Sequence, residues 1–174
     1  VAIHARTARQ MYEGRVDLEA FAEAAARCAH PVVYNGDIRT RADWRRLKAR
    51  FPGVTRWMLG RGLAADPFLV GRIRGGGAEP RDPLRLKGFL DDYLAESVEA
   101  FAGDAPVLGR MKELWSYLHA SLRGGGRVWS ALKVCRTVDE YRRVVEALFK
   151  AFSGFEADEA LDAIPDGEAA PRNA

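Results

Sequence analysis

The chain contains little cysteine and histidine: two Cys and three His among 174 residues. Cys28 and Cys135 lie far apart, and neither His30 nor His119 has a partner at the spacing of a metal site or a catalytic triad. We therefore expect no metal site, and we expect both cysteines to be buried structural thiols in a reduced, cytoplasmic setting. No apolar run approaches the roughly 20 residues that span a membrane, so we expect no membrane partner.

Positive charge is unevenly distributed along a chain whose net charge is +3. Residues 1–74 carry 14 Lys/Arg against 7 Asp/Glu, residues 105–143 carry 8 against 3, and the chain is acidic from residue 154 onward. Two basic zones in one protein predict a polyanionic partner such as nucleic acid. The alternative is an arginine-rich chain whose charges are only solvated.

Short apolar segments alternate with helical patterns in the first 74 residues. Strands are predicted at residues 1–4, 32–34 and 54 or 56 to 59, and helices at 18–29, 40–51 and 64 or 66 to 72. Asp17 is a plausible N-cap for the first helix, and Thr40 with Asp43 has capping-box spacing for the second. This alternation predicts parallel βα units. Three strands cannot close a barrel, which needs eight strands and about 250 residues, so we expect the last three βα units of a barrel.

A segment rich in glycine and proline, residues 75–83, separates this region from a helical second half. Apolar residues recur there at helical spacing, as in the face formed by Leu86, Leu90, Tyr93, Ser97 and Phe101. We predict α/β plus all-α architecture: the C-terminal part of a TIM (β/α)8 barrel followed by a small helical bundle. The predicted domains are residues 1–74, residues 75–153 and an acidic, flexible tail at residues 154–174.

Glycine and polar residues follow the second and third predicted strands, as Asn35-Gly36-Asp37 and Gly60-Arg61-Gly62. Barrels often bind phosphate at the ends of their last two strands. Glycine lets backbone N–H groups approach an anion, a helix start favours negative charge, and arginine adds a charged contact. The pattern predicts a site for a cofactor phosphate. The alternative is an ordinary Asn-Gly turn and a flexible Gly-Arg-Gly loop.

Two further groups of residues suit binding. His4 and Arg6 follow the first strand, where alternate side chains point the same way, so we expect both at the barrel mouth. Arg110 and Lys112 lie in the basic helical zone, where cations beside an exposed aromatic suit RNA. The alternatives are a histidine bonded at a strand end with Arg6 in solvent, and an ordinary solvated helix.

These segments resemble tRNA-dihydrouridine synthases. His4-Ala5-Arg6-Thr7, with Gln10 and Tyr12, resembles their H-x-R-T-x-x-Q-x-Y segment, and residues 31–38 (PVVYNGDI) resemble their P-V-x-x-N-G-D/E-I strand. Residues 58–63 (MLGRGL), followed by Pro67, resemble their M-x-G-R-G-x…P segment. In the helical half, residues 109–112 (GRMK) and 116–118 (SYL) resemble a helix of the bacterial subgroup that modifies position 16 in the D-loop.

The resemblance implies an FMN-binding barrel joined to a helical domain that holds tRNA. In that family FMN, reduced by NADPH, converts a tRNA uridine to 5,6-dihydrouridine, and a cysteine supplies the proton. It implies that FMN is bound by His4, Asn35, Gly36, Asp37, Gly60 and Arg61. It implies that tRNA is contacted by Arg6, Gln10, Tyr12, Arg110 and Lys112.

The resemblance covers only the C-terminal half of the family's length, and the chain begins inside a predicted strand without a starting Met. The family's catalytic cysteine precedes that region, so we expect no catalytic residue in this chain and no full activity from it alone. We expect a monomer at full length. Two other functions stay open: a non-catalytic RNA-binding fragment, which would be colourless, and another FMN-dependent barrel oxidoreductase acting on a small molecule, which would leave the basic helical zone unexplained.

Overall fold

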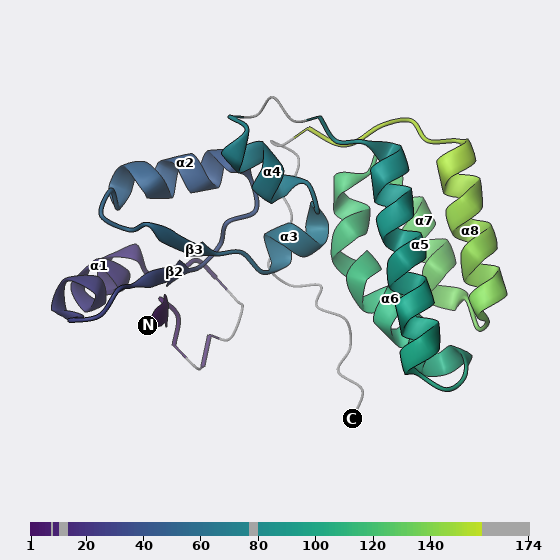
Figure 1. Ribbon diagram of the computed structural model, residues 1–174, viewed down its shortest axis with the longest axis horizontal. Coiled ribbons are helices and arrows are strands. Elements are labelled where there is room, and N and C mark those ends of the chain that lie inside the picture. Colours follow the sequence, from purple (N-terminus) through teal and green to yellow (C-terminus); the bar gives the residue numbers. More distant parts are fainter. Residues whose placement is uncertain (8, 11–13, 77–79, 158–174) are drawn as a thin grey trace.

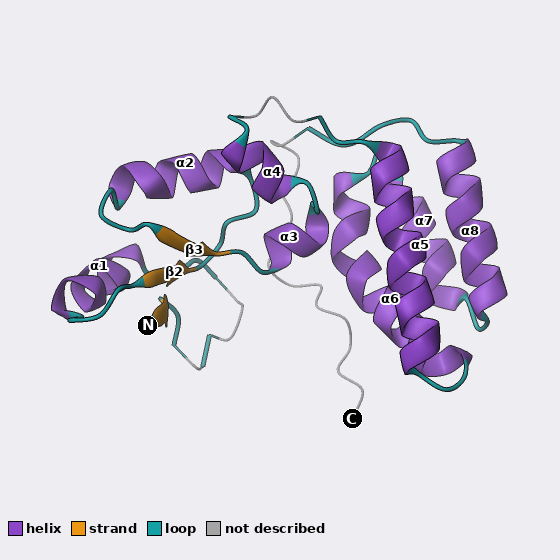
Figure 2. Cartoon of the chain, in the orientation of Figure 1, coloured by secondary structure: helices purple, strands orange, loops and turns teal. Residues whose placement is uncertain are grey.

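The computed structural model describes residues 1–7, 9–10, 14–76 and 80–157. Strands β1 (Ala2–His4), β2 (Val33–Asn35) and β3 (Arg56–Met58) form a parallel sheet in the order β1-β2-β3 (Figures 1 and 2). The register aligns His4 with Asn35 and Asn35 with Met58. The carboxyl ends of the three strands therefore lie at one edge of the sheet, and the predicted parallel βα pattern is confirmed.

Four helices accompany the strands: α1 (Leu18–Arg27), α2 (Arg41–Arg50), α3 (Arg61–Ala65) and α4 (Leu69–Arg74). Asp17 accepts hydrogen bonds from the first turn of α1, and Thr40 and Asp43 form a reciprocal capping box on α2, as predicted. The buried ring of Tyr34 on β2 meets Phe21 of α1 edge-on, with 4.8 Å between ring centroids. These contacts hold α1 against the sheet.

The prediction of one short helix from residue 64 or 66 to 72 is wrong, because α3 and α4 are separate helices. Proline has no N–H to donate and disfavours helical backbone in the residue before it. Pro67 therefore interrupts the helix, and Asp66 adopts extended backbone at φ −133° and ψ 94°. The first helix also begins earlier than predicted, at Arg61, directly after Gly60.

The second half contains α5 (Pro83–Ala100), α6 (Asp104–Leu118), the 3-10 turn η1 (His119–Ser121), α7 (Gly125–Val134) and α8 (Val138–Lys150). We call residues 1–74 the sheet part and residues 83–150 the helical part. The helices pack around a shared core with fully buried Met111 and Trp115, and the Trp115 indole Nε1 donates a 2.9 Å hydrogen bond to the Tyr141 hydroxyl. On α5, Leu94 is buried, whereas Phe101 follows the last helical residue and is exposed, unlike the predicted face.

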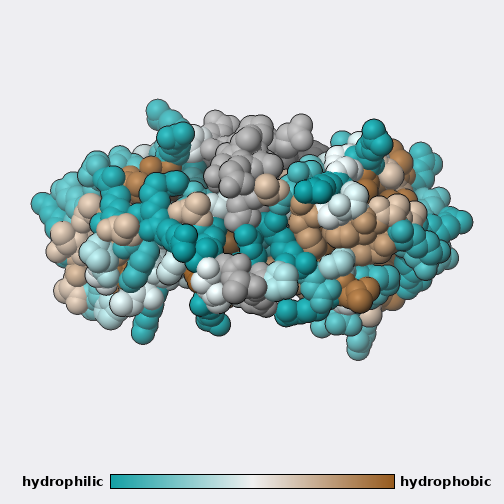
Figure 3. All heavy atoms as spheres, turned by 90° about the horizontal axis from the view of Figure 1, so that it is seen from above, coloured by the Kyte–Doolittle hydropathy of each residue, from teal (hydrophilic) through white to brown (hydrophobic). Residues whose placement is uncertain are grey.

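The two parts share apolar contacts. Phe68 of the sheet part belongs to the buried cluster of the helical part, and α3 packs against α6 (Figure 1). The space-filling view from above shows a mainly hydrophilic surface over the sheet part and a hydrophobic area over the helical part (Figure 3). In the described part of the chain, no helix combines the length and apolarity needed to cross a membrane.

Candidate functional site

A pocket of about 340 Å³ lies at the carboxyl edge of the sheet. It is lined by every residue that the sequence suggested for a cofactor: His4, Asn35, Gly36, Asp37, Gly60 and Arg61. They end or directly follow three different strands, so the parallel register brings together residues more than 50 positions apart in sequence. Residues that the prediction did not include also line it, among them Arg39 and Tyr117.

Asp37 organises the charge in this pocket. Its carboxylate accepts hydrogen bonds of 3.0 and 2.6 Å from Nη1 and Nη2 of Arg6, and a further one of 2.9 Å from Nη2 of Arg61. The Arg6 side chain is 1% exposed, whereas that of Arg61 is 25% exposed. One carboxylate thus binds two guanidinium groups, and these three groups together carry more positive than negative charge, which favours an anion in the pocket. Helix α3 has only five residues, so we assign this preference to the arginines and not to the helix dipole.

His4 presents a ring nitrogen without a partner. Its Nδ1 lies 3.0 Å from the backbone oxygen of Asn35, and because a carbonyl only accepts, Nδ1 carries the hydrogen. Nε2 is buried and has no hydrogen-bond partner in the described residues. Buried polar atoms are normally paired, so Nε2 is available to accept from a ligand when the ring is neutral, or to donate when it is protonated.

Two glycines in the pocket are required by packing. A Cβ on Gly36 would lie 2.4 Å from the hydroxyl oxygen of Tyr34, and a Cβ on Gly62 would lie 2.1 Å from the backbone oxygen of Ile38. In contrast, a Cβ on Gly60 meets no atom within 4 Å, so the chain leaves open space beside this residue. Burial and the nearby Asp37 carboxylate raise the pKa of Tyr34 to about 12, so the phenol stays neutral behind the pocket.

Of the three residues near the start of the chain that the resemblance assigns to tRNA contact, the structure describes Arg6 and Gln10. Arg6 is turned towards Asp37 and the backbone oxygen of Gly14, 2.5 Å away, and Gln10 accepts a 3.0 Å hydrogen bond from the backbone N–H of Thr7. Tyr12 lies outside the described residues. A contact of these side chains with a uridine stays a prediction.

On the helical part, Arg110 and Tyr117 lie on one face of α6, because seven residues make about two helical turns. The Arg110 side chain is 49% exposed and pairs with Glu113 at 3.4 Å. Tyr117 lines the pocket. Lys112 instead donates to the backbone oxygens of Lys133 (3.0 Å) and Cys135 (2.8 Å) at the end of α7, which gives its ammonium a structural contact.

Sequence reasoning did not place Tyr117 in the pocket. The sequence showed an aromatic residue in a basic helix, but only the packing of α6 against α3 brings it next to Arg61 and Gly60. No local pattern encodes a contact between residues so distant in the chain.

The cysteines lie away from the pocket. Both are free; Cys135 is buried, and burial raises the pKa of its thiol. This agrees with the prediction of a structural thiol, whereas Cys28 is only partly buried at the end of α1. Among the residues that the structure describes, no cluster of three His, Cys, Asp or Glu could hold a metal ion.

Comparison with known proteins identifies relatives over most of the chain. The dihydrouridine synthase (Dus) family model matches residues 1–153. The chain is 34% identical over 152 residues to the tRNA-dihydrouridine(16) synthase of Cupriavidus necator, covering 85% of this chain and 46% of that protein. It is 34% identical over 150 residues to the enzyme of the same name from Ralstonia nicotianae, covering 84% and 45%.

A tRNA-dihydrouridine(16) synthase from Shewanella oneidensis is 28% identical over 146 residues, again covering 84% of this chain and 45% of the relative. The chain thus spans about half the length of the curated relatives it matches. The relatives agree with the subgroup that the α6 sequence resembles. The match includes the three strand ends, the pocket and α6, and it establishes that the chain belongs to the dihydrouridine synthase family.

Proposed function

We propose that this chain forms the cofactor-phosphate and RNA-binding part of a flavin-dependent tRNA-dihydrouridine synthase that reduces a D-loop uridine of tRNA. The observation that carries this proposal is the convergence of three strand ends on one positively charged pocket. FMN, with NADPH as reductant, would supply the hydride for the uracil ring. A tRNA substrate implies a cytoplasmic reaction.

The pocket fits the phosphate end of FMN on three observations. Asp37 and the arginines leave a net positive charge, Nε2 of His4 is buried without a partner, and the backbone beside Gly60 is open. In this proposal Arg61 binds the phosphate. Asp37 orients Arg61, and the buried Arg6 in turn holds Asp37 in position. Asn35 and Gly36 line the remaining wall, and Nε2 of His4 hydrogen-bonds the cofactor.

The helical part supplies the RNA contacts in this proposal. Tyr117 offers an aromatic ring at the pocket, and Arg110 extends the same face of α6 away from it. Aromatic rings stack on bases that leave a helix, and arginines bind the phosphates on either side. A base turned out of its stack could then approach the pocket while the backbone follows α6.

The cofactor half of the proposal is tested by titrating the chain with FMN and riboflavin, followed by flavin fluorescence. We expect FMN to bind more tightly than riboflavin, which has no phosphate. Arg61→Gln removes a charged hydrogen bond worth about 1.5–3 kcal/mol, so FMN affinity should fall by about ten- to a hundredfold. The matched control is Arg56→Gln, at the start of the same β3 strand, where the side chain is exposed and outside the pocket. Equal binding of FMN and riboflavin, or equal effects of the two variants, would refute the proposal.

The RNA half is tested by the salt dependence of tRNA binding. Removing one phosphate contact with Arg110→Gln should weaken binding and reduce the slope of log K against log salt by about one unit. The control is Arg142→Gln on α8, because Arg142 is similarly exposed and also pairs with an acidic residue three positions away. Tyr117→Leu should weaken tRNA binding with little change in the salt slope. Identical curves for the Arg110 and Arg142 variants would contradict this assignment.

A further inference from the structure

The junction between the sheet part and the helical part contains a buried carboxylate that the proposed chemistry does not use. Asp66 lies between α3 and α4 and is 2% exposed. Its Oδ1 accepts a 3.0 Å hydrogen bond from the backbone N–H of Phe68. A buried carboxylate is costly unless it is paired, so the remaining partners of Asp66 indicate what it does.

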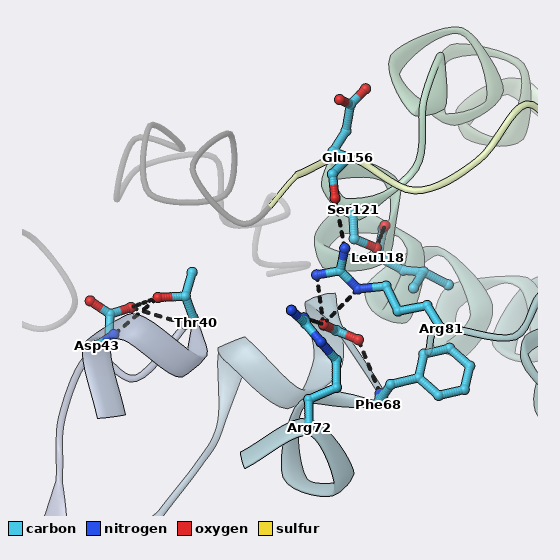
Figure 4. Close-up of polar contacts among 9 residues, drawn as sticks. Thr40, Asp43, Phe68, Arg72, Arg81, Leu118, Ser121 and Glu156 are labelled. Atoms are coloured by element: carbon cyan, nitrogen blue, oxygen red, sulfur yellow. Dashed lines mark hydrogen bonds and ion pairs between the residues drawn. The ribbon is translucent and has the colours of Figure 1, made fainter. Parts of the chain in front are cut away.

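Two arginines pair with Asp66: Arg72 in the sheet part and Arg81 in the segment that joins the two parts. Nη1 of Arg72, on α4, lies 2.9 Å from Oδ2, and Arg81, just before α5, reaches the same oxygen through Nε at 3.0 Å and Nη2 at 2.9 Å. The two side chains are only 15% and 9% exposed. Arg72 belongs to the sheet part and Arg81 leads into the helical part, so a single carboxylate joins them (Figure 4).

The chain segment after α8 returns to this junction and completes it. The Nη1 of Arg81 donates a 2.6 Å hydrogen bond to the backbone oxygen of Glu156 (Figure 4). The N–H of Glu156 in turn donates to the backbone oxygen of Ser121 at 2.9 Å. Phe155 pairs with Leu122 in an isolated antiparallel bridge, and its ring meets that of Phe68 edge-on at 6.0 Å. We call residues 154–156 the strap. The strap begins the segment that the sequence predicted to be a flexible tail, and residues 158–174 lie outside the described part.

The strap contacts Ser121 of η1, which directly follows the end of α6 that carries Tyr117. The contacts of Asp66 therefore connect, through Arg81 and the strap, to the helix whose Tyr117 lines the pocket. The Arg81 contacts link Asp66 to the residues just before α5 and, through Glu156 and Ser121, to the end of α6, so a rotation of the helical part relative to the sheet part would disturb them. Elements held by a buried charge network have few alternative arrangements, because each alternative leaves a charge unpaired.

We propose that Asp66 is a positioning residue that fixes the orientation of the helical part relative to the pocket. RNA bound to α6 and an anion bound in the pocket would then keep a fixed distance and orientation to each other. The consequence for RNA rests on the proposed function, whereas the consequence for orientation does not. The structure also contains a natural comparison. Asp43 is a second buried carboxylate, but its partners Arg39, Thr40 and Arg46 all lie in the sheet part; Figure 4 shows its contact with Thr40.

The orientation is measured by pulsed electron paramagnetic resonance. Spin labels are attached at Ala26→Cys on α1 and Ala147→Cys on α8, both exposed positions, after Cys28→Ser and Cys135→Ser. We expect one narrow distance distribution in this background and a broadened or shifted one after Asp66→Asn. Asp43→Asn, the same chemical change within the sheet part, should leave the distribution narrow. Circular dichroism checks that helix content is retained in each variant.

Arg81→Met provides a second, independent test if Asp66→Asn does not fold, because it keeps most of the side-chain volume and leaves Asp66 paired with Arg72. It should also broaden the distribution. Unchanged distributions in these variants would overturn the proposal. In tRNA titrations, Asp66→Asn should weaken binding by about fivefold relative to Asp43→Asn, with unchanged affinity for FMN. Absence of tRNA binding by the unsubstituted chain would count against the proposed function, while the distance measurement would still decide the role of Asp66.

Discussion

Replacing Gly62 with alanine tests whether close packing of α3 against the loop after β2 shapes the pocket. An added Cβ would lie 2.1 Å from the backbone oxygen of Ile38 and 2.9 Å from the Cα of Arg39. Ordinary contact begins at 3.4 Å, and the obstacles are backbone atoms that cannot rotate away. The α3 helix must therefore move by about 1 Å, since interiors packed to crystal-like density have no space to absorb an extra methyl group.

The size of the effect follows from two opposing contributions. Overpacking a well-packed site costs about 1–3 kcal/mol, and here the cost is at the upper end because main chain must shift. Alanine in a helix is about 1 kcal/mol more favourable than glycine. We expect a net loss of about 2 kcal/mol in the free energy of unfolding, which corresponds to a fall of about 4–8 °C in Tm for a chain of this size. The shift of α3 should also move Arg61 away from Asp37 and weaken FMN binding.

Gly88→Ala is the matched control, because Gly88 also lies inside a helix, α5, and a Cβ there meets no atom within 4 Å. We expect this variant to be at least as stable as the parent chain, since alanine is about 1 kcal/mol more favourable than glycine in a helix. Urea unfolding followed by circular dichroism measures both variants. A Gly62→Ala variant as stable as Gly88→Ala would refute the reasoning, since it would mean that α3 is not held tightly against this loop.

Three further predictions concern the cap, the buried phenol and the thiols. Thr40→Ala should lower the free energy of unfolding by about 1 kcal/mol, measured in urea, because it removes the capping box of α2. Tyr34→Phe should change stability little at pH 7. The pKa of Tyr34 is about 12 in the folded chain against 10.0 in the unfolded chain, so the parent chain keeps this contribution to stability below pH 10 and loses it as the pH rises towards 12. The phenylalanine variant should show a shallower loss of stability across this range, and an equal loss would contradict the assignment. Cys28 should react with iodoacetamide faster than buried Cys135 in peptide mass spectra, and equal rates would show that Cys135 is accessible.

Family membership makes the three parallel βα units part of a TIM barrel. The prediction of this pattern succeeded because its signals are local. Asp17 and the Thr40–Asp43 pair cap helices within three residues of themselves, and short apolar segments bounded by turn residues are typical of strands. The prediction failed where a local signal was misread, at Pro67, which interrupts a helix that was expected to be continuous.

The sequence by itself determined which strand-end residues gather in the pocket, because parallel strands place their carboxyl ends at one edge and therefore group the residues that end or follow them. It could not determine which partner each charge takes there. Asp37 had been assigned to a cofactor and Arg6 to a uridine, and the folded chain pairs them with each other. Only the tertiary structure decided that Tyr117 lies at the pocket and that Asp66 is buried between Arg72 and Arg81. These contacts depend on the angle at which the helical part packs against the sheet part, and no periodicity within a single helix or strand specifies that angle.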